Sequence, residues 1–191
     1  MNAKLLTSTS MITGKVALSY PNLLTPSTTE VSKGKYGCNF FLFSEEDKQL
    51  ISEICNAAYQ EALSKTWGGK KPAAIEPRVK PVDEDKPHPE GALYTVSCSN
   101  VNKPIQTISA SKERITDPNS PDIYGGQFAR AQLRAFGWEF AGKRGVSISI
   151  MAVQILGGGQ PLGGGADINA FDDETEPLTT DTPNLNSDLP F

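Results

Sequence analysis

The sequence has few of the side chains on which catalysis and metal binding depend. It contains one histidine, His88, which lies between two prolines, and three cysteines that form no Cys-x-x-Cys pair. A zinc site needs several such ligands at short spacing, and a Ser-His or Cys-His catalytic pair would depend on that one loop histidine. The phosphate loop Gly-x-x-x-x-Gly-Lys-Ser/Thr is also missing. We therefore expect no enzyme activity, no metal and no cofactor.

Long apolar runs are lacking as well. The sequence has no stretch of about 18 apolar residues, and its first residues do not form a charged segment followed by an apolar one. These absences predict no membrane contact, no secretion and a cytoplasmic location. Cys38, Cys55 and Cys98 are odd in number and widely spaced, which indicates buried thiols in a reducing cytosol rather than a disulfide framework. At 191 residues, the chain is long enough for one domain with a sizeable core and short for two.

Basic charge ends at Arg144, so the net charge of −4 is an average of two unlike pieces. Residues 1–166 carry all 18 basic side chains and 15 acids, whereas residues 167–191 carry seven acids and no base. Glycine triplets at 157–159 and 163–165 are typical of a flexible linker. We divide the chain into a binding domain (1–156), a Gly-rich linker (157–170) and an acidic tail (171–191), which we expect to be disordered. A basic body beside an acidic tail indicates that the body binds a polyanion and the tail imitates one.

The tail has a hydrophobic last residue. It ends in Asp188-Leu189-Pro190-Phe191 after a long, mostly polar stretch, which argues against a tail that serves solubility alone. A terminal phenylalanine and carboxylate can enter an apolar pocket rimmed by Lys or Arg, while the preceding acids steer the encounter. These four residues are therefore predicted to bind partner proteins.

Hydrophobic patterning predicts five or so strands and one helix. Residues 12–20 and 36–43 are predicted to be the first two strands. Ser44 begins a helix, because it precedes three acids that suit a helix N-terminus, and apolar residues continue at helical spacing to a stop at 67–69. Residues 70–91, with five prolines, are predicted to form a long exposed loop. Further strands are expected at 94–101, 105–110, 127–140 and 146–156, which together indicate a mainly β protein built as a small closed barrel.

The strand at 127–140 alternates in character. One face carries small apolar residues, namely Ala129, Ala131, Leu133, Ala135 and Gly137. The other face interleaves rings with polar and cationic groups, namely Phe128, Arg130, Gln132, Arg134, Phe136, Trp138 and Phe140. Unpaired arginines are costly to bury, so we expect this second face to be open to water. Guanidinium groups bind phosphates and rings stack on unpaired bases for about 1–3 kcal/mol per base, which indicates single-stranded nucleic acid as the ligand.

A more ordinary interpretation of this strand stays open. Aromatic residues on strands are more often part of a core, and Phe128 or Phe140 would then simply cover the helix. Basic and aromatic residues elsewhere extend the predicted path, although isolated surface charges are usually just solvated; they are Lys33, Lys35, Tyr36, Lys112 and Arg114.

Several segments together resemble a family of bacteriophage single-stranded DNA-binding proteins. They are Ser19-Tyr20-Pro21-Asn22-Leu23, the strand at 36–43 with its helix, Asn102-Lys103-Pro104, and Tyr124-Gly125-Gly126-Gln127-Phe128-Ala129-Arg130-Ala131. The resemblance covers residues 11–156 and the acidic tail. It implies an oligonucleotide/oligosaccharide-binding (OB) fold, a five-stranded barrel here carrying one helix after the second strand and long loop insertions. It also places the face from Phe128 to Trp138 on the binding side. In this family polar residues such as Asn are common at the positions of Arg130 and Arg134, so a phosphate role there rests on this chain's own pattern.

The tail is similar to that of bacterial single-stranded DNA-binding proteins, which end in Pro-Phe. The resemblance implies that Asp188, Leu189, Pro190 and Phe191 dock on replication and recombination proteins. We therefore predict a protein that binds single-stranded DNA without regard to sequence, acting in phage DNA replication, recombination or repair in the cytoplasm of an infected bacterium. Its tail would recruit partners and compete with DNA.

Three other functions stay open. The first is binding of RNA or duplex DNA by the same barrel. The second is a protein interaction module, or an inhibitor that mimics DNA through its acidic tail. The third is a nuclease that uses Asp83, Glu84 and Asp85, although a solvated loop explains that acidic run better. Binding-site size, cooperativity and assembly into a homo-oligomer are not set by the sequence.

Overall fold

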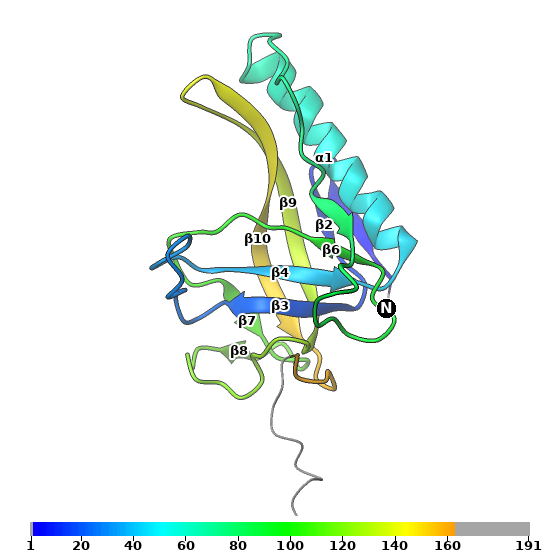
Figure 1. Ribbon diagram of the computed structural model, residues 1–191, viewed down its shortest axis with the longest axis vertical. Coiled ribbons are helices and arrows are strands. Elements are labelled where there is room, and N and C mark those ends of the chain that lie inside the picture. The colour runs from blue at the N-terminus through cyan, green and yellow to red at the C-terminus, as the bar shows by residue number, and fades with distance from the viewer. Residues whose placement is uncertain (1, 163–191) are drawn as a thin grey trace, which may run out of the picture.

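The computed structural model describes residues 2–162, which form a mainly β fold with one long helix (Figure 1). The elements in chain order are β1 (Lys4–Thr7), β2 (Ser10–Ile12), β3 (Val16–Asn22), β4 (Gly37–Leu42), α1 (Glu45–Lys65), β5 (Val79–Pro81), β6 (Tyr94–Val96), β7 (Gln106–Ile108), β8 (Arg114–Ile115), β9 (Phe128–Phe140) and β10 (Lys143–Ile155). The predicted class, mainly β with one helix, is confirmed, although the helix follows the fourth strand, β4, and not the second.

The strands pair into one sheet of ten strands, in the order β5-β6-β4-β3-β9-β10-β7-β8, with β2 on β9 and β1 on β2. Every pairing is antiparallel except that of β10 with β7. The strand pairings do not close this sheet into a barrel, and the sheet has ten strands where five were predicted. The prediction of a closed five-stranded barrel is therefore not matched by the strand pairing. Part of the difference is due to β1, β5 and β8, which have four, three and two residues, because strands so short leave no periodic signal in a sequence.

The predicted strand at 12–20 is in fact two strands, and a buried carboxylate accounts for the break. Asp47, in the first turn of α1, accepts a hydrogen bond of 2.8 Å from the backbone N–H of Gly14, between β2 and β3. Ser44 is the predicted N-cap, and its hydroxyl accepts from the backbone N–H of Asp47 at 3.2 Å. Asp47 thus contributes its N–H to the cap of the helix and its carboxylate to the chain where it leaves β2.

The buried face of α1 packs against the sheet, and Figure 1 shows α1 standing beside the long hairpin of β9 and β10. Of the predicted stripe, Ile51, Ile54, Ala58 and Ala62 are buried, whereas Leu50 is half-buried against the core. Gly137 of β9 allows the close approach, since a Cβ at this position would lie 2.1 Å from the Cβ of Ala62.

Trp67, just after α1, joins the helix to the hairpin. It is 2% exposed, and its Nε1 donates a hydrogen bond of 3.1 Å to the carbonyl of Trp138. Its ring also packs edge-on against Tyr59, with 5.4 Å between ring centroids. The distal half of the hairpin is therefore held by α1.

The first part of the predicted linker packs on the domain. The hydroxyl of Tyr124 donates to the carbonyl of Gly159 at 2.9 Å, and the N–H of Leu162 donates to the carbonyl of Gly125 at 2.8 Å. Gly126 has a φ of +97°, and a Cβ there would lie 1.9 Å from the carbonyl oxygen of Gln160. The remaining linker and the acidic tail, with Asp188–Phe191, lie outside the described residues.

The three cysteines carry free thiols. Burial raises the pKa of Cys38 to about 12, partly offset by a backbone hydrogen bond at Ser19, and raises that of Cys55 to about 11. Burial also raises the pKa of Cys98. Because the thiolate is the nucleophile and the metal ligand, these thiols are chemically inert near neutral pH.

Within residues 2–162, no helix is long and apolar enough to cross a membrane.

Candidate nucleic-acid interface

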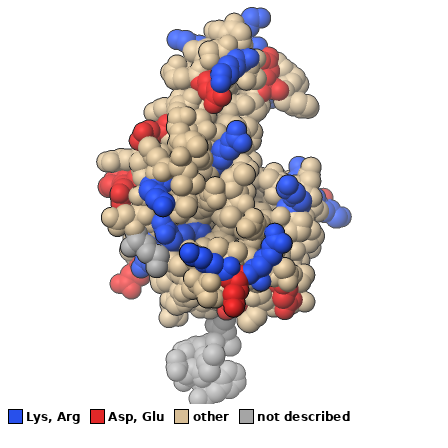
Figure 2. All heavy atoms as spheres, turned by 180° about the vertical axis from the view of Figure 1, so that it is seen from behind, with Lys and Arg blue, Asp and Glu red and all other residues tan. Residues whose placement is uncertain are grey.

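Strand β9 has the predicted alternation. Its small apolar residues from Ala129 to Ala135 are buried, and its other side is half-buried or exposed. Arg134 is exposed, and Phe136 is 37% exposed. Opposite them on β10 stand Ser149 and Ser147, small residues that cannot cover a ring or a guanidinium group. On the face turned away from the viewer of Figure 1, basic side chains gather around a shallow hollow with few acids among them (Figure 2).

Two of the predicted β9 residues have structural partners. Arg130 donates from Nε to the carbonyl of Thr13 at 2.9 Å and from a terminal nitrogen to the carbonyl of Asn2 at 3.0 Å. Its guanidinium therefore ties the N-terminal segment to β9. Phe128 packs edge-on against Phe43 at 5.8 Å between centroids, and the Nζ of Lys15 lies 4.4 Å from the centroid of the Phe128 ring. Packing, the alternative left open for Phe128, accounts for its position.

The remaining predicted residues of β9 differ in how far they are exposed. Gln132 is half-buried, whereas Phe140, at the tip of the hairpin, is 79% exposed and does not cover α1. Trp138 is half-buried. Its Nε1 donates to the hydroxyl of Ser147 at 3.0 Å, and a Cβ on Gly145 would lie 2.7 Å from its ring. The glycine thus lets the indole lie against β10 in a fixed position.

The predicted extensions of the path are spread around the sheet. Lys33 and Lys35 are exposed in the loop before β4, whereas Tyr36 is half-buried against the core and its N–H donates to the carbonyl of Val101 at 2.8 Å. Lys112 is exposed in the turn between β7 and β8, and Arg114 lies on β8. In the sheet order β10 and β7 stand between β8 and β9, so Lys112 and Arg114 lie two strands or more from β9.

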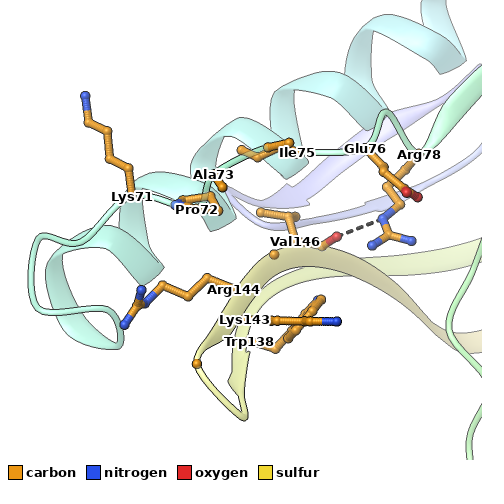
Figure 3. Close-up of a pocket in the computed structure, with 13 residues that line it drawn as sticks. Lys71, Pro72, Ala73, Ile75, Glu76, Arg78, Trp138, Lys143, Arg144 and Val146 are labelled. Atoms are coloured by element: carbon orange, nitrogen blue, oxygen red, sulfur yellow. Dashed lines mark hydrogen bonds between the residues drawn. The ribbon is translucent and has the colours of Figure 1, made fainter.

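A groove of about 610 Å³ opens between residues 71–78 and the tip of the β9–β10 hairpin (Figure 3). Trp138 lies in its wall, and Glu76 is the one acid among its lining residues. Four cations also line it, namely Lys71, Arg78, Lys143 and Arg144. We call this the Trp138 groove. It joins a ring to several positive charges, which is the combination that single-stranded nucleic acid requires.

The four cations of the Trp138 groove are engaged to different degrees. Arg78 donates from Nε to the carbonyl of Val146 at 2.7 Å (Figure 3), and Arg144 donates to a carboxylate oxygen of Glu139 at 2.7 Å. Lys71 and Lys143 are exposed and take part in none of the ion pairs among residues 2–162. Within the described residues the two lysines are therefore available to bind anions, whereas the two arginines are held by hydrogen bonds to other groups of the protein and form part of the groove wall.

Sequence reasoning missed these four cations. Lys71 and Arg78 lie in the proline-rich segment interpreted as an exposed loop, and Lys143 and Arg144 lie in a turn. The sequence offers one signal, namely two adjacent basic residues at 70–71 and again at 143–144. Solvated loops also carry such adjacent basic residues, so the signal does not distinguish a binding site from an ordinary loop.

The acidic run at 83–85 has ordinary partners. Asp83 pairs with Lys86 at 2.6 Å, and Glu84 lies 3.4 Å from the ring of His88. In the described part of the chain no three His, Cys, Asp or Glu side chains gather in a way that could hold a metal ion. The geometry therefore offers no support for the nuclease alternative in this region.

The chain is similar to solved structures of phage proteins. One is the single-stranded DNA-binding protein from bacteriophage Enc34 in complex with single-stranded DNA, with a TM-score of 0.68, 21% identity and coverage of 85% of this chain and 94% of that chain. Another is a C-terminal truncation of the same protein, with a TM-score of 0.67, 21% identity and coverage of 84% and 92%. The gp2.5 single-stranded DNA-binding protein of bacteriophage T7 follows at 0.54, with 15% identity and coverage of 89% and 96%. These likenesses establish a shared fold.

A comparison with curated protein sequences finds no match. The family model described as Enterobacter phage Enc34, ssDNA-binding protein, matches residues 9–181. This match spans most of the chain and confirms the resemblance inferred from the sequence motifs. The protein therefore belongs to the phage single-stranded DNA-binding protein family that is represented by the Enc34 protein.

Proposed function

We propose that this protein binds single-stranded DNA without regard to sequence and has no enzymatic activity. It would coat exposed strands during phage DNA replication, recombination or repair in the cytoplasm of the infected host. The observation that carries the proposal is the Trp138 groove, which is lined by an indole held by Ser147 and by two lysines that form no ion pair within residues 2–162. Cations attract the phosphates that every strand carries, and a ring stacks on any base, so neither contact reads sequence.

We further infer an OB-type barrel within the sheet, formed by β3, β4, β6, β10 and β9. One contact supports its closure beyond the regular ladder. The N–H of Ser99 donates to the carbonyl of Ile148 at 2.7 Å, which links the chain after β6 to β10. An isolated bridge between Tyr36, just before β4, and Val101 extends the pairing of β4 with the β6 segment. In this arrangement β4 and β6 separate β3 from β10, as the strand order of an OB barrel requires.

Within this barrel we assign roles residue by residue. Trp138 and Phe136 would stack on bases, and Arg134, Lys71 and Lys143 would bind phosphates. Arg130 and Phe128 would support the fold through the contacts described above. If three to five phosphates are neutralised, the logarithm of the binding constant should fall against the logarithm of salt concentration with a slope of roughly −2 to −4.

Tryptophan fluorescence tests the proposal, because Trp67 and Trp138 are the two tryptophans in the chain. Oligo-dT is expected to quench the fluorescence of the wild type and of Trp67→Phe, since Trp67 is 2% exposed and is not among the residues that line the groove. Quenching should disappear in Trp138→Phe. In Trp138→Ala the affinity should fall about tenfold, because one stacked base contributes about 1–3 kcal/mol.

The outcomes separate the functions. Quenching that survives in Trp138→Phe and disappears in Trp67→Phe would move the site away from β9. A wild type that gives no gel shift with an oligonucleotide longer than the 4–16 nucleotides one OB domain covers would favour a protein interaction module. Competition with single-stranded RNA and with duplex DNA tests the remaining alternative.

We propose that the acidic tail has two roles. It would recruit replication or recombination proteins of the infected cell through Asp188–Phe191, and the seven acids of residues 167–191 would compete with DNA for the cations of the body. Truncation after Ala166 is therefore expected to tighten DNA binding at low salt and to abolish partner recruitment. Titration of both forms at two salt concentrations checks this, and the difference should shrink as salt rises. Equal or weaker DNA binding by the truncated form at low salt would refute the competition.

A further inference from the structure

Tyr20 stands out on β3 because it is a large ring held almost fully in water. Its side chain is 80% exposed, although it follows four buried residues of the same strand. The pairing of β3 with β4 is irregular between Ser19 and Asn22. This bulge places Tyr20 outside the regular ladder, and the side-chain amide of Asn22 donates to the carbonyl of Tyr20 at 3.1 Å.

The backbone of Tyr20 is strained as well as exposed. Its φ is +48°, in the left-handed region that a residue with a Cβ occupies at a cost. Burial of the ring does not offset that cost, because most of the ring faces water. Strained residues concentrate at ligand sites, where the strain holds a group in its working position.

The ring borders a cavity of about 290 Å³ on the outer side of the sheet. The cavity is lined by Phe41 of β4, by Pro21 and Pro87, and by Leu162 from the segment that packs against residues 124–127. No acidic side chain of residues 2–162 lines it. Its walls are flat and apolar, which suits a planar aromatic ligand.

Positive charge is available beside this cavity. Lys86 lies next to Pro87, and its pKa is raised chiefly by its hydrogen bond with Asp83 and to a smaller extent by the nearby Tyr20. The Lys86–Asp83 pair is exposed, so it holds the lysine weakly and can exchange for a phosphate.

We propose that Tyr20 and the cavity beside it form a second base-binding site, in which an unpaired base of single-stranded DNA stacks on the tyrosine ring. The proposal rests on the proposed function and adds to it a contact outside the Trp138 groove. The base supplies the planar aromatic surface that the cavity fits, and its phosphate meets Lys86. Stacking accepts every base, so the site keeps binding independent of sequence.

Tyr20→Gly separates a binding role from a structural one. Glycine adopts a positive φ without strain, so the bulge should survive and the melting temperature should stay within a few degrees of the wild type. The affinity for oligo-dT is expected to fall about tenfold, the loss that follows from removing one stacked base. Tyr20→Phe keeps the ring and should restore the wild-type affinity.

An abasic oligonucleotide of the same length provides the decisive comparison. It carries the phosphates but nothing to stack, so Tyr20→Gly and the wild type should bind it equally. Wild-type affinity of Tyr20→Gly for oligo-dT would overturn the proposal and would leave the surface to a protein partner. Equal weakening on both oligonucleotides would overturn it as well, because the tyrosine would then act on the backbone or the fold. Failure of the wild type to bind oligo-dT would instead refute the proposed function itself.

Discussion

Replacing Lys71 and Lys143 together by alanine is expected to weaken binding of single-stranded DNA about 50-fold at about 50 mM monovalent salt. Both lysines line the Trp138 groove, and neither is ion-paired within the described residues. Each phosphate contact on a single strand contributes about −0.7 to the slope of log K against log salt. Loss of two contacts should therefore make the slope shallower by about 1.4, so the deficit shrinks about 25-fold, to about twofold, near 0.5 M salt.

Titration of oligo-dT against a series of salt concentrations measures both quantities. Lys4→Ala is the matched control, since it removes one exposed charge on β1, away from the groove. The slope in this control should stay near that of the wild type. If the double variant keeps the wild-type slope, phosphates do not meet these lysines, and the DNA path must follow other cations such as Arg134 or Lys33.

Gly137→Ala is expected to destabilise the fold by about 2–3 kcal/mol. The new methyl group would lie 2.1 Å from the Cβ of Ala62 and 3.5 Å from the carbonyl oxygen of Ala58, both on α1. The helix has to move away from β9, because a Cβ cannot rotate out of a contact. Alanine restricts the unfolded chain more than glycine does, which stabilises the folded state by about 0.5–1 kcal/mol. This stabilisation is smaller than the cost of the clash.

Urea denaturation followed by circular dichroism measures this loss, and a second substitution serves as its control. Ala62→Gly in the same chain removes the opposing methyl group and should recover part of the stability, even though glycine within a helix costs about 1 kcal/mol. The shift of α1 should also disturb the Trp138 groove, since Trp67 connects α1 to the carbonyl of Trp138. Unchanged stability of Gly137→Ala would mean that helix and hairpin do not pack as closely as described.

The elements that could be predicted are those set by neighbours in the chain. The helix starts at Ser44 because its own hydroxyl accepts the N–H three residues later, a contact encoded within four residues. The alternation of β9 could be predicted for the same reason, since thirteen residues of one strand carry the pattern themselves. Strands β1, β5 and β8 could not be predicted, because their few residues are ordered by pairing with partners from elsewhere in the chain.

The candidate site likewise has some residues that the sequence could predict and others that it could not. Trp138, Phe136 and Arg134 were predicted from one strand. The Trp138 groove was not, because its walls come from distant segments, as in the bond between Arg78 and Val146, which are 68 positions apart. Arg130 shows the converse, since its place in the pattern predicted a phosphate ligand, and only the structure shows that it donates hydrogen bonds to the carbonyls of Thr13 and Asn2.

The sequence by itself determined that this chain has a basic body, one helix and a strand that alternates between small residues and a face of rings and cations, because these features depend on local order and composition. It also determined the family resemblance, through motifs that are contiguous in the chain. The tertiary structure alone decided which cations stand beside Trp138, which arginine is already occupied, and that Tyr20 is held in water in a strained conformation. These are properties of contacts between segments far apart in the sequence, and such contacts exist only once the chain has folded.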